Sequence, residues 1–167
     1  MIDYQKERAK YCPRIVETLL IGEAPPPSGN TYFYVPKVMG LGKSVENDTS
    51  LPATIFNHYF GKRPESINEY KKFLITLKHN GIYLIDIIDE PIKIRGNKEN
   101  ESYLISKLPE LRNKIANLKI DIAEDNWKFL LARNSYKSKV NQYFPKAGKV
   151  RWKDFRLNIE AKLLTTM

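Results

Sequence analysis

Residues 19–34 read LLIGEAPPPSGNTYFY, and this stretch decides the fold. It contains the end of the apolar, partly β-branched segment 15–22, and a glycine closes that segment as expected for a buried strand. Three prolines, a polar turn and three aromatic residues then follow. Residues 23–52 show no hydrophobic periodicity, so we expect a long loop there, and loops of this length in compact domains are typically functional or disordered.

Working outward, similar apolar runs predict further strands at residues 81–88 (GIYLIDII), 127–133 (WKFLLAR) and 142–145 (QYFP). Helices are expected at residues 3–10, 53–60, 66–81, 100–118, 135–141 and 151–164, and Pro109 is expected to kink or split the fourth of these. The alternation predicts one α/β domain over residues 1–167, a three-layer α/β/α sandwich with a central, mostly parallel four-stranded sheet. Ligands of such sheets bind outside the carboxyl ends of the strands.

The positive charge of the chain is concentrated near its carboxyl end. The net charge is +9, and residues 128–162 contain ten basic residues and two acidic ones, interleaved with aromatic residues. Such a segment neutralises phosphates and releases counterions, which favours a nucleic acid as the partner. The alternative interpretation is an ordinary solvated basic surface.

Several functional classes lack support in the sequence. No apolar run has the length of a membrane span, and residues 1–12 lack the apolar core of a signal peptide, so we expect a cytoplasmic protein without membrane contact. The lone cysteine, Cys12, excludes an internal disulfide and multi-cysteine metal sites. The segment GLGKS (40–44) has Lys37 where a phosphate-binding loop requires its first glycine.

The residues Gly22-Glu23-Ala24-Pro25 after a buried strand, followed by Phe33, resemble the first motif of the uracil-DNA glycosylase superfamily. Members of this superfamily carry G-E-x-P-G or G-Q-D-P-Y there, with a stacking phenylalanine further along the chain. Segment 81–88 resembles the second strand, whose terminal polar residue, usually asparagine, faces the base. Segment 143–163 resembles the late strand, the DNA-contacting loop and the closing helix.

The resemblance implies a monomer that binds DNA, single-stranded or damaged DNA included, and hydrolyses the N-glycosidic bond of a flipped base without a metal or cofactor. It assigns the catalytic carboxylates to Glu23 and Asp86. Base binding falls to Phe33 as the stacking ring, to Tyr34 or Tyr32 as the wall, and to Ala24, where some relatives have a water-activating Asp. The expected DNA contacts are Ser28, Lys146, Lys149 and Arg151.

Three departures from the family pattern qualify these expectations. Pro26 replaces a glycine, Asp86 replaces the asparagine, and Phe144-Pro145-Lys146 replaces a His-Pro-Ser motif. An ionised Asp only accepts hydrogen bonds, so it suits a base with an exocyclic amine better than uracil. A catalytically degenerate nucleic-acid-binding protein of the same fold and a small-molecule hydrolase or transferase therefore remain alternatives.

The residues themselves also allow purely structural roles. The three aromatic residues 32–34 would then fill the core, and Glu23 would accept hydrogen bonds from loop N–H groups. Asp86 and Asp89 would cap the turn that follows their strand.

Overall fold

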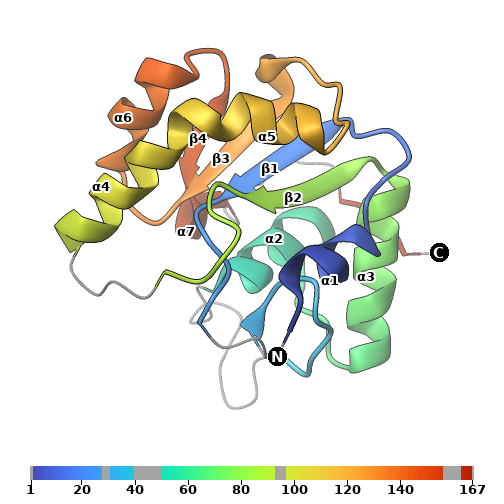
Figure 1. Cartoon of the computed structure of the whole chain (residues 1–167). Coiled ribbons are helices and arrows are strands. Elements are labelled where there is room, and N and C mark those ends of the chain that lie inside the picture. Colours follow the sequence, from blue (N-terminus) through green and yellow to red (C-terminus); the bar gives the residue numbers. More distant parts are fainter. Residues whose placement is uncertain (1, 28–30, 40–49, 93–96, 156–162, 167) are drawn as a thin grey trace.

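The computed structural model describes residues 2–27, 31–39, 50–92, 97–155 and 163–166. Its centre is a sheet of four parallel strands in the order β2-β1-β3-β4 (Figure 1). The strands are β1 (Thr18–Gly22), β2 (Ile82–Asp86), β3 (Trp127–Leu131) and β4 (Gly148–Arg151). The predicted α/β sandwich with a four-stranded parallel sheet is therefore confirmed.

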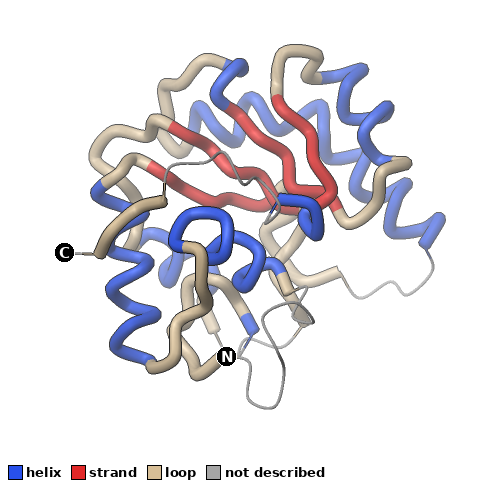
Figure 2. The backbone as a smooth tube through the Cα atoms, turned by 180° about the vertical axis from the view of Figure 1, so that it is seen from behind, coloured by secondary structure: helices blue, strands red, loops and turns tan. Residues whose placement is uncertain are grey.

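Helices cover both faces of the sheet. Figures 1 and 2 show α1, α2 and α3 on one face and α4, α5 and α6 on the other. The short helix α7 packs against α2 and so belongs to the first layer. The helices are α1 (Tyr4–Ala9), α2 (Leu51–Phe60), α3 (Ile67–His79), α4 (Asn97–Lys107), α5 (Leu111–Asn117), α6 (Tyr136–Tyr143) and α7 (Trp152–Phe155), with single 3-10 turns η3 (Leu108–Glu110) and η4 (Glu124–Asn126).

Local sequence signals explain the helix ends. The hydroxyl of Ser66 accepts a hydrogen bond of 3.1 Å from the backbone N–H of Glu69 and so caps α3. Gly81 then ends this segment with a φ of 72°, a value that glycine adopts at little cost. Pro109 separates α4 from α5 through the turn η3, so the expected helix over 100–118 is split as anticipated.

The fourth strand lies three residues beyond the end of the predicted one. Residues 142 and 143 belong to α6, and Phe144 is buried against Phe129, so the prediction of a strand at 142–145 is wrong. Strand β4 is an edge strand whose four residues are all half-buried. Because it has no fully buried face, it lacks the apolar run by which the other strands are recognised.

The order of the strands determines where a ligand site is expected. From β1 the chain crosses to β2 on one side, and it later returns to β3 on the other side. The crevice at the carboxyl ends of β1 and β3 is therefore the topological switch point. Residues Leu19–Ile21 of β1 are at most 1% exposed, which holds this crevice on a rigid core.

Candidate active site at the carboxyl ends of the strands

A cavity of about 360 Å³ opens at the carboxyl edge of the sheet. Its described lining comes from the corner after β1, from segment 31–33, from the start of α2, from β2 and Ile92 beyond it, and from the residue after β4. The predicted residues in this lining are Glu23, Ala24, Phe33, Asp86 and Tyr32, the last of which is predicted as an alternative to Tyr34. Five of the predicted site residues thus converge on one cavity.

Asp86 is the last residue of β2, and its carboxyl group is buried at the cavity wall. The residue is 4% exposed and belongs to the lining of the cavity. Burial raises the pKa of Asp86 to about 7, against the opposing positive charges of Lys114 and Arg8. A comparable share of protonated and ionised carboxyl therefore exists near neutral pH. The protonated form donates one hydrogen bond and accepts others.

Gly22 makes room for this carboxyl group. Gly22 and Asp86 are directly paired between β1 and β2, and a Cβ atom on Gly22 would lie 2.6 Å from Oδ1 of Asp86. Carbon and oxygen atoms do not approach so closely without displacement. The glycine of the motif therefore allows the side chain of Asp86 to lie across the end of β1.

Glu23 bridges the switch point. Its Oε2 accepts a hydrogen bond from the backbone N–H of Ala132, which immediately follows β3. Glu23 also lines the cavity, so it can both accept the hydrogen bond from Ala132 and face a ligand in the cavity. Burial raises the pKa of Glu23, while the Ala132 N–H and the charge of Arg133 act against this rise.

Two of the three consecutive aromatic residues form one wall of the cavity. Phe33 is 4% exposed and stacks on Phe56 with a centroid separation of 5.3 Å, and its carbonyl accepts the hydroxyl of Tyr70 at 2.6 Å. Tyr32 lines the same cavity and meets the ring of Tyr4 edge-on at 4.9 Å. These rings fill the core and line the cavity at once, which makes the wall rigid.

Tyr34 lies outside this cavity, contrary to its predicted role in base binding. Its hydroxyl donates to the carbonyl of Leu84 at 2.8 Å and accepts from the N–H of Leu84 at 2.7 Å. Because β2 is an edge strand, these two backbone groups face away from β1 and need a partner. Tyr34 therefore completes the hydrogen bonding of β2.

Two of the predicted DNA contacts lie away from the cavity. Lys146 precedes β4, so it lies at the amino edge of the sheet, where its N–H bonds to Glu124. The ammonium group of Lys149 is held by Asn141 and by the Ala147 carbonyl, which also precedes β4. The structure therefore does not bring Lys146 and Lys149 to the rim of the cavity: Lys146 precedes β4, and the ammonium group of Lys149 is bonded on that same side, opposite to the carboxyl ends of the strands.

Other cations do lie at the carboxyl edge. Arg151 ends β4 and forms an ion pair of 3.1 Å with Asp154. Arg133 lies two residues beyond β3, and Lys153 is exposed in α7. Ser28, the remaining predicted DNA contact, and the GLGKS segment lie outside the described residues.

Trp152 is a cavity residue that sequence reasoning missed. It immediately follows β4 and lines the cavity from the side opposite to β2 in the strand order. The available signal was its position directly after a strand. Placing the fourth strand at 142–145 concealed that signal.

Neither a metal cluster nor a membrane span is found in the described ranges. No group of three or more His, Cys, Asp or Glu residues there has an arrangement that would hold a metal ion. No described helix combines the length and the apolar character that crossing a bilayer requires. Comparisons with protein-family models, with curated proteins and with solved structures found no match for this chain.

Proposed function

We propose that this protein binds a single extruded DNA base in the cavity between β1, β2 and Trp152 and hydrolyses its N-glycosidic bond, as a divergent uracil-DNA glycosylase-like enzyme. The observation that carries the proposal is the convergence of Glu23 and Asp86 with an aromatic wall at the switch point. The cavity volume of about 360 Å³ falls in the range of roughly 300–1,000 Å³ that is typical of small-molecule sites.

Asp86 is the group proposed to read the base. Its ionised form accepts a hydrogen bond from an exocyclic amine, as cytosine and adenine present. Its protonated form offers one donor and one acceptor, which is the pair that an asparagine amide would offer. The pKa of about 7 makes both forms accessible at neutral pH, so replacement of the family's asparagine by Asp86 is compatible with base recognition.

Glu23 is proposed to act on the sugar side of the scissile bond. It takes a proton from a water molecule whose oxygen bonds to the anomeric carbon, while the carbon–nitrogen bond breaks and its electron pair leaves with the base. Protonated Asp86 donates a proton to the departing base. The raised pKa of Glu23 suits a general base, since a more basic carboxylate accepts a proton more readily.

A single-turnover assay of base release tests this proposal on a panel of oligonucleotides that carry normal and damaged bases. We expect release from at least one substrate, and a loss of about 100-fold or more in Glu23→Gln and in Asp86→Asn, the usual size of a general acid–base contribution. Glu65→Gln and Asp121→Asn change exposed carboxylates and are the matched controls. Unchanged release in both site variants would refute the assigned roles.

Binding without catalysis is the second candidate, and the position of the late motif favours it. Phe144 is 2% exposed and packs on Phe129, and Lys146 lies at the opposite edge, so neither group reaches a departing base. No Lys, Arg or His is among the described residues of the cavity lining. A salt titration of DNA binding distinguishes the two candidates. A binding constant that falls steeply with salt concentration on a log–log plot, together with no base release from any substrate, supports this candidate.

A further inference from the structure

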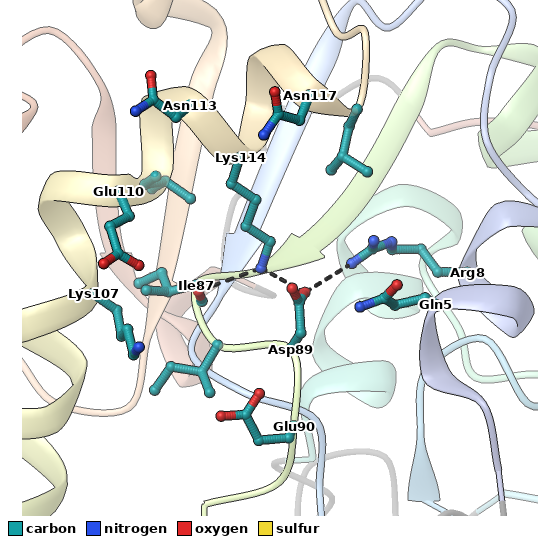
Figure 3. A pocket seen from close by; sticks show the side chains of 13 residues that line it. Gln5, Arg8, Ile87, Asp89, Glu90, Lys107, Glu110, Asn113, Lys114 and Asn117 are labelled. Carbon is teal, nitrogen blue, oxygen red and sulfur yellow. Dashed lines mark hydrogen bonds and ion pairs between the residues drawn. The ribbon is translucent and has the colours of Figure 1, made fainter.

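A second cavity, of about 490 Å³, shares no described lining residue with the first. Figure 3 shows it between α1, α5 and the segment that follows β2. Most of its side chains are polar or charged, with amides from Gln5, Asn113 and Asn117. A polar lining of this kind suits a small polar ligand rather than an apolar one.

Arg8 is the group in this cavity whose bonding is incomplete. The residue is only 5% exposed, and its Nε has no hydrogen-bond partner. Its one carboxylate partner in the described chain is Oδ1 of Asp89, at 3.5 Å from a terminal nitrogen, and the hydroxyl of Tyr83 lies beside it. Charge-assisted bonds of this type are normally about 2.7–2.9 Å long. A guanidinium with five N–H donors is therefore buried with too few acceptors.

Asp89 cannot serve Arg8 fully because Lys114 holds the same oxygen. The distance from Nζ of Lys114 to Oδ1 of Asp89 is 2.6 Å, and this ammonium also donates to the backbone carbonyls of Asp86 and Ile87. In Figure 3 Lys114 and Arg8 approach Asp89 from opposite sides. One carboxylate oxygen thus bridges two cations, and it lies closer to the lysine.

We propose that this second cavity binds the oxyanion group of a small polar ligand, a carboxylate or a phosphate, on the guanidinium of Arg8. The oxyanion supplies the acceptors that Arg8 lacks, and the amides of α1 and α5 bind the remainder of the ligand. Glu90 and Glu110 in the lining repel a polyanion, so the ligand carries a single anionic group. This proposal does not rest on the proposed glycosylase chemistry, although Arg8 and Lys114 also act electrostatically on Asp86.

The test uses the full chain with acetate and inorganic phosphate as probes, titrated at constant ionic strength against chloride. The side-chain Nε–Hε signal of Arg8 is followed by NMR, and the affinity is measured by calorimetry. We expect saturable binding of at least one probe with a shift of the Arg8 signal. Arg8→Gln is expected to abolish the binding, and Arg14→Gln, which removes an exposed arginine, to leave it unchanged.

Asp89→Asn keeps the test decisive if Arg8→Gln fails to fold. Because this variant removes the carboxylate that competes for Arg8, we expect binding to tighten by on the order of tenfold. Absence of saturable binding in both the wild type and Asp89→Asn would overturn the proposal. An equal affinity in both would overturn it as well. Arg8-dependent binding of a 5′-phosphorylated oligonucleotide, with none of either free anion, would show that the site takes nucleic acid instead.

Discussion

The carboxylate of Glu23, directly after β1, accepts a hydrogen bond from the backbone N–H of Ala132, directly after β3. The two residues lie on either side of the switch point, where the chain provides no further strand pairing. One side chain therefore both closes the crevice and lines the candidate active site.

Glu23→Ala is expected to lower the free energy of unfolding by about 1–3 kcal/mol, because it leaves the N–H of Ala132 without its acceptor. Glu23→Gln keeps an amide oxygen at the same position and is expected to retain most of that stability. Urea unfolding of the two variants, with Glu65→Ala as an exposed control, measures the difference. If the two variants lost the same free energy of unfolding, the acceptor oxygen at this position would not account for the lost stability.

Asp86→Asn is expected to change how stability depends on pH. The pKa of Asp86 is about 7 in the folded chain, against about 3.9 for an unfolded Asp. A raised folded-state pKa contributes stability that is fully present below the unfolded value and is lost as the pH rises through the folded one. The wild type should therefore lose up to roughly 4 kcal/mol from this group between about pH 4 and pH 8.

The Asn variant lacks that loss, because an amide does not ionise in this range. Urea unfolding at pH 5 and pH 8 gives the free energy of unfolding of both proteins. Relative to the wild type, the variant should be more stable at pH 8 than at pH 5. Asp121→Asn, at an exposed position, is the control. If the difference in the free energy of unfolding between Asp86→Asn and the wild type were the same at both pH values, the pKa of Asp86 would not be raised in the folded chain.

Gly22→Ala is expected to displace Asp86 and to destabilise the fold by about 1–3 kcal/mol, the usual cost of overpacking. The new Cβ would lie 2.6 Å from Oδ1 of Asp86. Gly148→Ala is the matched control within the sheet, since its Cβ would meet its nearest neighbour at an ordinary 3.5 Å. Combining Gly22→Ala with Asp86→Ala should remove most of the cost, and a double-mutant cycle without such coupling would contradict the proposed close approach.

The sequence predicts the position of Glu23 and Asp86 at the ends of β1 and β2 well, because the signals for these strands are local. The core triplets Leu19–Ile21 and Phe129–Leu131 are buried on both faces, so their continuous apolar runs locate the parallel strands. The ends of β1 and β2 then place Glu23 and Asp86 at one edge. Edge strand β4 has no such run, and its misplacement hid Trp152 and put Lys146 on the wrong side of the sheet.

The roles of consecutive aromatic residues are beyond sequence reasoning for a different reason. Tyr32, Phe33 and Tyr34 follow a loop without a regular period, so no pattern indicates which ring faces the cavity. Only the tertiary contacts separate Tyr34, which bonds to the edge of β2, from its two neighbours.

Tyr34→Phe is therefore expected to affect stability and not base binding, and Trp152→Ala to affect base binding. Tyr34→Phe removes two buried hydrogen bonds to Leu84 and should cost about 1–3 kcal/mol of stability without changing base release or base binding. Trp152→Ala should weaken binding of the extruded base, since stacking on an aromatic side chain contributes about 1–3 kcal/mol per base. Equilibrium unfolding and binding titrations with a substrate oligonucleotide measure the two effects. Weakened base binding in stably folded Tyr34→Phe would place that ring in the site after all.

Lys153→Gln and Lys146→Gln form a matched pair that tests which edge of the sheet faces DNA. Both lysines are exposed, but Lys153 follows β4 at the cavity edge and Lys146 precedes β4 at the opposite edge. If DNA approaches the cavity, Lys153→Gln should weaken binding equally across sequences and reduce the log–log salt slope by about 0.9, the value for one phosphate contact on duplex DNA. Lys146→Gln should leave both quantities unchanged. The reverse pattern, measured by fluorescence anisotropy between 50 and 200 mM salt, would mean that the basic carboxyl-terminal segment binds DNA away from the two acids, and the glycosylase proposal would fail with it.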